Sequence, residues 1–186
     1  PWISGMAQGL AASVLIRMYL LTDDNRYLEF AERALNVLQV PIDEGGALCR
    51  DKHGTWIEEV AVKPPAHILN GFIFAIIGIN DYMQLRENRL LRNLFIETVK
   101  TLVHNIDLYD LGLWSKYDLL YHIVAPFRYH IIHVEQLIYL YTITGLEKFK
   151  FIAQKWRIQH KSEALSLLRY YMLPKFKQKI YSTLMF

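Results

Sequence analysis

The segment MYLLTDDNRYLEFAERA, residues 18–34, decides the fold, because a similar phrase, LYTITGLEKFKFIAQKW, returns at residues 140–156. The alignment pairs residues of the same kind: Thr22 with Thr144, Tyr27 with Phe149 and Ala31 with Ala153. In each copy an apolar run is followed by a polar break and then by apolar residues three and four apart, the pattern of an amphipathic helix. The two copies therefore predict two antiparallel helix hairpins.

The first copy continues a longer apolar segment, SGMAQGLAASVLIRMYLLT, at residues 4–22. Small and apolar residues cover almost every side of it, and Ser4 is a suitable N-cap, so we expect a buried helix. Residues 70–103 predict a third hairpin, in which an apolar segment again precedes an amphipathic one. Hairpins with an inner and an outer helix favour an all-α fold, an incomplete α/α toroid, over a four-helix bundle. Helix pairs alone do not distinguish a closed toroid from an open solenoid.

Two stretches without helical periodicity interrupt the hairpins, at residues 43–65 and 107–126. The first contains DKHG at 51–54 and predicts a small β-hairpin insert that turns there. Glu58 and Glu59 follow on extended chain, so their side chains face opposite ways and only one of them enters a cleft. This argues against a glycosidase acid and base pair. Both inserts lie between helices, where toroids carry their chemistry, and we expect the functional site there.

The composition excludes several classes of function. A formal charge of +3 over 186 residues is too small to indicate a nucleic-acid binder. The one basic and apolar segment, residues 169–186, is interpreted as a solvated end, with a membrane-surface or interface role as the alternative. Cys49 is the single cysteine, which excludes an intramolecular disulfide and a cysteine metal site. The sequence has no uncharged run of about eighteen residues, so no membrane span is predicted. The compartment is left open.

Phenols and imidazoles gather in KYDLLYHIVAPFRYHIIHVEQL, residues 116–137. Tyr129, His130 and His133 open a predicted helix just after its proline, and Gln136 extends the His133 face. Aromatic residues at helical spacing often only pack, but four polar side chains near one helix end need partners or a ligand. No metal site is predicted, because the two histidines are three apart, whereas the zincin motif needs a spacing of four with a glutamate between them.

Five segments together resemble the C-terminal domain of the D-glucuronyl C5-epimerases, in the same order and with similar spacing from Pro1 to about Trp156. They are PWISGMAQGLAASVLIRMYLLT, GTWIEE, PPAHILNGFIFAIIGINDY, LYDLGLWSKYDLL, and YHIIHVEQL with a later KW. A single segment of this kind means little, but five in order are specific. The chain is therefore identified as a microbial relative of this family.

The resemblance implies one α/α barrel-like domain over residues 1–186, preceded in family members by a β-rich region that these residues do not contain. It implies inversion of carbon five of D-glucuronate units in a polysaccharide, giving L-iduronate without a cofactor. One group takes the proton beside the carboxylate from one face, and another delivers a proton to the opposite face. The implied partner is an anionic, uronate-containing polysaccharide, and relatives often pair as homodimers through this domain.

The family's functional residues carry over motif by motif. Tyr117 matches the tyrosine of the family's YDL motif and Tyr129 that of its YH motif, so both are the implied proton-transfer residues. A phenol has a reference pKa near 10 and donates a proton, or accepts one as a phenolate where cations lower that pKa. Six further positions match family positions and are implied to bind substrate or to support the site: Trp56, Glu59, Asn70, His130, His133 and Gln136.

Two positions depart from the family pattern. The tyrosine of the family's W-[YF]-E-E-Y-P stretch falls at Val60, and the arginine after YDL in animal relatives falls at Leu120. Valine cannot transfer a proton, so Tyr121, Tyr109 or a tyrosine of the region that precedes this domain in family members would have to compensate. Arg128, where animal relatives have aspartate, is predicted to supply the missing cation for the uronate. These departures leave two alternatives open: a degenerate relative that binds an anionic glycan without turnover, and a toroid lyase or hydrolase.

Overall fold

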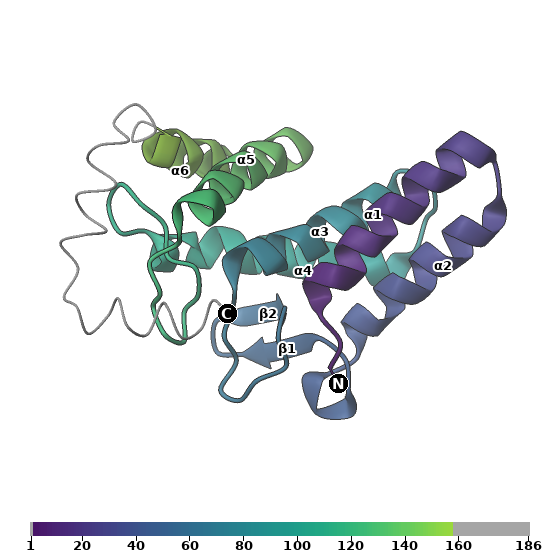
Figure 1. Cartoon of the computed structure of the whole chain (residues 1–186), viewed down its shortest axis with the longest axis horizontal. Helices are drawn as coiled ribbons and strands as arrows, with labels where there is room; N and C mark the ends of the chain where they lie inside the picture. The colour runs from purple at the N-terminus through teal and green to yellow at the C-terminus, as the bar shows by residue number, and fades with distance from the viewer. Residues whose placement is uncertain (1, 158–186) are drawn as a thin grey trace.

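Three antiparallel helix hairpins make up most of residues 2–157, the part of the chain that the computed structural model describes (Figure 1). The helices are α1 (Gly5–Thr22), α2 (Asn25–Asn36), α3 (Leu69–Met83), α4 (Arg89–Asn105), α5 (Phe127–Thr144) and α6 (Glu147–Arg157). Between α2 and α3 the strands β1 (Leu48–Asp51) and β2 (Gly54–Ile57) form a two-stranded antiparallel sheet. The predicted helical fold with a small β-hairpin insert is therefore confirmed. The basic segment 169–186 lies outside the described residues.

The repeat seen in the sequence is also a repeat of helix-end geometry. α1 is followed by Asp23 and α5 by Gly145, both in the left-handed region with φ of 55° and 69°. Each donates its N–H to the carbonyl four residues earlier, at 2.8 Å. Thr22 and Thr144 each donate their hydroxyl to the carbonyl four residues earlier, at 2.7 and 2.6 Å. Two distant parts of the chain thus end an inner helix in the same way.

The inner helices α1, α3 and α5 lie next to one another, and α2, α4 and α6 each pack against the inner helix of their own hairpin (Figure 1). α3 is buried along most of its length. α1 meets it where a Cβ on Gly78 would lie 2.4 Å from the carbonyl oxygen of Gly9 and 2.6 Å from its Cα. No side chain fits at such distances, so these two glycines allow the close approach of the inner helices.

The two non-helical inserts lie at the end of the domain where the inner helices begin. The carbonyl of Glu58, just past β2, accepts a hydrogen bond of 2.8 Å from the first N–H of α1. The carbonyl of Tyr117 accepts one of 3.0 Å from the first N–H of α3. The N–H of Ser115 donates to Nδ1 of His130 in the first turn of α5, at 3.2 Å. These bonds bring the inserts and three helix N-termini together into one region.

The β-hairpin turns within DKHG, as predicted, with Asp51 opposite Gly54. Oδ1 of Asp51 accepts hydrogen bonds from the N–H groups of His53 and Gly54, at 2.8 and 3.2 Å. The N–H of Thr55 donates to Oγ1 of Thr101 on α4, at 2.8 Å. The hairpin is thus anchored to an outer helix on one side and to the start of α1 on the other. Within residues 2–157 no helix has the length and apolar character needed to cross a membrane.

Candidate functional site

Tyr117 and Tyr129 lie edge to face where α5 begins. Their ring centroids are 4.9 Å apart with 74° between the ring planes, and both residues are half-buried. Tyr117 comes from the insert before α5, whereas Tyr129 stands in the first turn of the helix. The structure therefore brings together the two phenols that the sequence assigned to proton transfer.

Glu59 is the carboxylate whose charge acts on Tyr117. Its side chain lies over the first turn of α3, where a Cβ on Gly71 would be only 2.3 Å from Oε2 of Glu59. That oxygen has no hydrogen-bond partner among the described residues. Burial, together with the charge of Glu58, raises the pKa of Glu59 above its ordinary value. The ionised carboxylate is therefore a stronger base than a solvated one.

The surroundings of Tyr117 are acidic. Burial, the charge of Glu59, the neighbouring Tyr129 and the charge of Asp118 all raise the pKa of Tyr117 above its ordinary value. No cation is among the groups that act on the pKa of Tyr117. Near neutral pH Tyr117 is therefore a neutral phenol, suited to donating a proton.

Four buried polar atoms lack a hydrogen-bond partner among residues 2–157: Glu59 Oε2, Asn70 Oδ1, His133 Nε2 and Gln136 Oε1. All four belong to residues that the sequence assigned to substrate binding. Asn70 and Gln136 are in contact, because Nε2 of Gln136 donates to the carbonyl of Asn70 at 3.0 Å. Unpaired buried polar atoms are rare and indicate either water or a ligand. Their gathering on α3, α5 and the end of the β-hairpin marks the candidate site.

His130 and His133 are fully buried and share one hydroxyl. Oγ of Ser115 lies 2.9 Å from Nδ1 of His130 and 2.8 Å from Nδ1 of His133. Trp114 stacks on His130 with ring centroids 3.9 Å apart. Burial and the neighbouring His130 lower the pKa of His133 to about 3, so His133 is neutral. The two histidines hold the insert that carries Tyr117 against α5, and their role in substrate binding stays a prediction.

Of the remaining predicted residues, Trp56 and Tyr109 are buried, whereas Arg128 and Tyr121 are exposed. Trp56 is fully buried beneath the hairpin and donates its indole N–H to Oδ1 of Asp51 at 3.0 Å. Tyr109 is also fully buried and donates its hydroxyl to the carbonyl of His67 at 2.6 Å, so it is not available to replace a lost phenol. Arg128 is exposed in the first turn of α5. Tyr121 is 67% exposed on the insert.

Ser115 and His67 are parts of this region that the sequence reasoning did not identify. A lone serine between an aromatic residue and a lysine has no distinctive pattern, and its two histidine partners lie 15 and 18 residues away. His67 meets carboxylates 9 and 16 residues away, across the β-hairpin. The one available signal was the carboxylate pair at 58 and 59, since a buried member of such a pair needs a cation.

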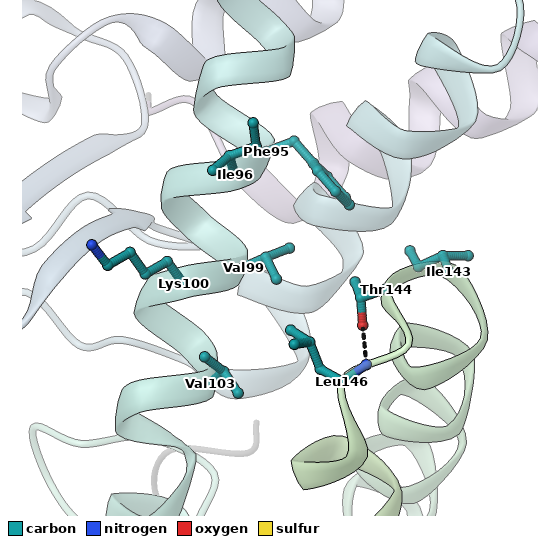
Figure 2. A pocket seen from close by; sticks show the side chains of 8 residues that line it. All are labelled: Phe95, Ile96, Val99, Lys100, Val103, Ile143, Thr144 and Leu146. Carbon is teal, nitrogen blue, oxygen red and sulfur yellow. Dashed lines mark hydrogen bonds between the residues drawn. The ribbon is translucent and has the colours of Figure 1, made fainter.

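A separate cleft of about 440 Å³ lies between α4 and the turn that joins α5 to α6 (Figure 2). Its lining is apolar apart from Lys100 and Thr144: Phe95, Ile96, Val99, Val103, Ile143 and Leu146 complete it. Thr144 ends α5, fifteen residues after Tyr129, which is about 22 Å along the helix axis. This cleft is therefore distinct from the candidate site, and its lining offers neither a carboxylate nor a phenol.

The fold is that of the α/α toroids. A solved structure of an inactive variant of α-1,6-mannanase GH76A from a Salegentibacter species, in complex with α-1,6-mannotetrose, matches with a TM-score of 0.59. The match covers 84% of this chain and 46% of that chain, at 17% sequence identity. At this identity the likeness shows the fold alone.

Within that class, the chain belongs to the D-glucuronyl C5-epimerase C-terminus family, whose model matches residues 1–158. A D-glucuronyl C5-epimerase of Caenorhabditis elegans is 32% identical over 177 residues, which cover 83% of this chain and 28% of that protein. An uncharacterised protein of Methanocaldococcus jannaschii is 34% identical over 160 residues, which cover 84% of this chain and 52% of that protein. The chain thus spans about half of one relative and less of the other. Family and fold together define an α/α toroid domain of the D-glucuronyl C5-epimerase C-terminus family.

Proposed function

We propose that this domain carries the proton-transfer site of a polysaccharide D-glucuronyl C5-epimerase. The observation that carries the proposal is the grouping of Glu59, Tyr117 and Tyr129 where the inner helices begin, in a chain of this family. Inversion of a carbon beside a carboxylate needs one group that accepts a proton and another that donates one from the opposite face. A carboxylate with a raised pKa beside two phenols supplies both kinds of group.

The proposed reaction begins with the Glu59 carboxylate taking the proton from carbon five of a glucuronate unit. The electron pair of the broken C–H bond moves into the sugar carboxylate as an enediolate. The phenol of Tyr129 or Tyr117 then delivers its proton to the other face of carbon five, which forms the new C–H bond of iduronate. The resulting phenolate is reprotonated and Glu59 deprotonated by exchange with solvent. In the reverse direction the carboxyl and the phenol exchange roles.

The sugar carboxylate must be neutralised while this charge develops. Arg128 stands in the first turn of α5, one residue before Tyr129, and we assign it this role together with the positive end of the helix. The unpaired oxygens of Asn70 and Gln136 are acceptors that suit sugar hydroxyl groups. His133 Nε2 is the remaining unpaired atom and is assigned to the same hydrogen-bonding surface.

A second candidate function is glycan binding without turnover, and Val60 favours it. The family pattern places a tyrosine there, next to Glu59, and valine supplies no proton. In this alternative the same residues bind an anionic, uronate-containing polysaccharide, and the phenols serve only as hydrogen-bonding and stacking surfaces.

Solvent deuterium incorporation at carbon five separates these functions. A non-sulfated glucuronate polymer is incubated in heavy water with the full chain, and the product is analysed by NMR. Incorporation with appearance of iduronate is the result expected for an epimerase. Saturable binding without incorporation would support the glycan-binding alternative, and an unsaturated product absorbing in the ultraviolet would show a lyase instead.

A further inference from the structure

Next to the candidate site, a buried cluster joins the β-hairpin to the start of α3. Nδ1 of His67 lies 2.6 Å from Oε1 of Glu58, and its Nε2 lies 3.2 Å from Oδ2 of Asp51. Glu58 is 1% and His67 7% exposed. Two carboxylates thus bracket one imidazole: Glu58 from the buried side and Asp51, whose side chain is 27% exposed, from the side that faces water. A buried carboxylate without a cation is strongly destabilising, so the cluster requires a positive charge on His67.

The protonation of His67 follows from these neighbours. Burial alone lowers the pKa of His67, but the hydrogen bond and charge of Glu58, together with those of Asp51, outweigh it and raise that pKa. The other titratable groups that interact with the cluster are Cys49 on β1, Tyr109 in the short 3-10 helix that follows α4, and Glu59. None of them is a cation. Among the described groups that face the two carboxylates, His67 is therefore the one that compensates their charge.

The cluster also fixes the backbone on both sides of the candidate site. Oε2 of Glu58 accepts a hydrogen bond from the N–H of His67 at 3.0 Å, and Tyr109 donates its hydroxyl to the carbonyl of the same residue. His67 has φ of 49°, in the left-handed region, and its ring stacks on Trp56 with centroids 4.2 Å apart. The chain from His67 to Asn70 is thereby held at the point where α3 begins.

Glu59 is the residue through which the cluster reaches the proposed chemistry. β2 ends at Ile57, and Glu59 lies in the bend that follows it. Glu58 contacts His67, while Glu59 lies against Gly71. The charge of Glu58 acts on Glu59 and raises its pKa. Because His67 lies 2.6 Å from Oε1 of Glu58, a positive charge on His67 opposes that effect by Coulomb's law. Any change in the charge of the cluster therefore changes the electrostatic potential at Glu59.

We propose that His67, together with Glu58 and Asp51, is a positioning device for the candidate site, which aims Glu59 at the phenols and sets the charge that Glu59 experiences. The inference rests on the proposed function, in which Glu59 accepts the C5 proton. His67 itself touches neither the phenols nor the reacting carbon in this account.

The test compares His67→Gln with His53→Gln, a control on the exposed turn of the same hairpin. The Glu59 carboxyl is titrated by carbon-13 NMR in the full chain, with its signal assigned by Glu59→Gln. Loss of the His67 charge leaves Glu58 uncompensated, so we expect the Glu59 titration to rise by about one pH unit. His53→Gln is expected to leave it in place. The acid limb of C5 deuterium exchange should move upward with it.

A second variant keeps the test decisive if His67→Gln does not fold. Glu58→Gln removes the neighbouring negative charge while keeping a hydrogen-bond acceptor for His67, so the Glu59 titration should fall. Shifts of opposite sign in the two variants support the proposal, because a merely structural role would not produce them. Titrations that match the control, or that move in the same direction, overturn it. The NMR titration needs no turnover, so absence of exchange in the parent would refute the proposed function without deciding this inference.

Discussion

Gly71→Ala tests whether the Glu59 carboxylate lies in the position that proton abstraction from carbon five requires. A Cβ at this position would lie 2.3 Å from Oε2 and 2.7 Å from Cβ of Glu59, distances that real Cβ atoms essentially never show. The carboxylate must therefore retreat by roughly 1 Å. Misplacement of a reacting group by about 1 Å costs about 100-fold in rate, or about 2.7 kcal/mol in the activation barrier.

The same change has a modest expected effect on folding. Overpacking costs about 1–3 kcal/mol. Alanine gains about 1 kcal/mol over glycine in a helix interior, and less at Gly71, which lies in the first turn of α3. We therefore expect the variant to remain folded and to lose activity. The assay is the rate of C5 deuterium incorporation at saturating polymer, with urea unfolding as the control for stability.

A double-mutant cycle completes the test. In a Glu59→Gln background, Gly71→Ala should cause little further loss, because the group that it displaces has already lost its function. A Gly71→Ala variant that is folded and exchanges deuterium at nearly the parent rate would refute the placement of Glu59 as the proton acceptor.

Three further outcomes are expected. Gly78→Ala should lower the free energy of unfolding by about 1–3 kcal/mol in urea, since its Cβ would meet the backbone of Gly9; an unchanged midpoint would show that the inner helices can separate freely. Ser115→Ala should lower the free energy of unfolding by about 1–3 kcal/mol, because it leaves Nδ1 of the buried His133 unpaired. Since the pKa of His67 is raised on folding, its contribution to stability is fully present below about pH 6.5 and is lost as pH rises through the folded pKa. The stability advantage of the parent over His67→Gln should accordingly shrink from neutral to alkaline pH, and a constant difference would contradict this reading.

The helical architecture could be predicted from the sequence because it depends on local sequence patterns. Apolar spacing of three and four residues, a cap at Ser4 and the matched breaks after Thr22 and Thr144 each depend on a few neighbouring residues. The β-hairpin turn at DKHG is equally local. Such patterns predict which segments become inner helices, but they do not show how closely Gly9 and Gly78 approach, which depends on packing between distant helices.

The candidate site could be predicted only in part from the sequence, because some of its properties depend on residues that are far apart in the chain. The resemblance and the spacing around Pro126 indicated Tyr117 and Tyr129, and the structure places their rings together. The pKa of Tyr117 could not be anticipated, because it depends on burial and on Glu59, which is 58 residues away in sequence. Trp56 was expected to bind substrate or to support the site, and the sequence does not show that its indole is buried and donates to Asp51.

The proton-transfer role of Tyr129 is tested by measuring C5 deuterium incorporation by Tyr129→Phe. The comparison is with the parent and with Tyr121→Phe, since the side chain of Tyr121 is exposed. Polymer binding is measured on the same samples. We expect Tyr129→Phe to abolish incorporation while polymer binding stays nearly unchanged, and Tyr121→Phe to behave like the parent. Full incorporation by a folded Tyr129→Phe variant, or equal loss of incorporation and binding, would contradict the proton-transfer role of this phenol.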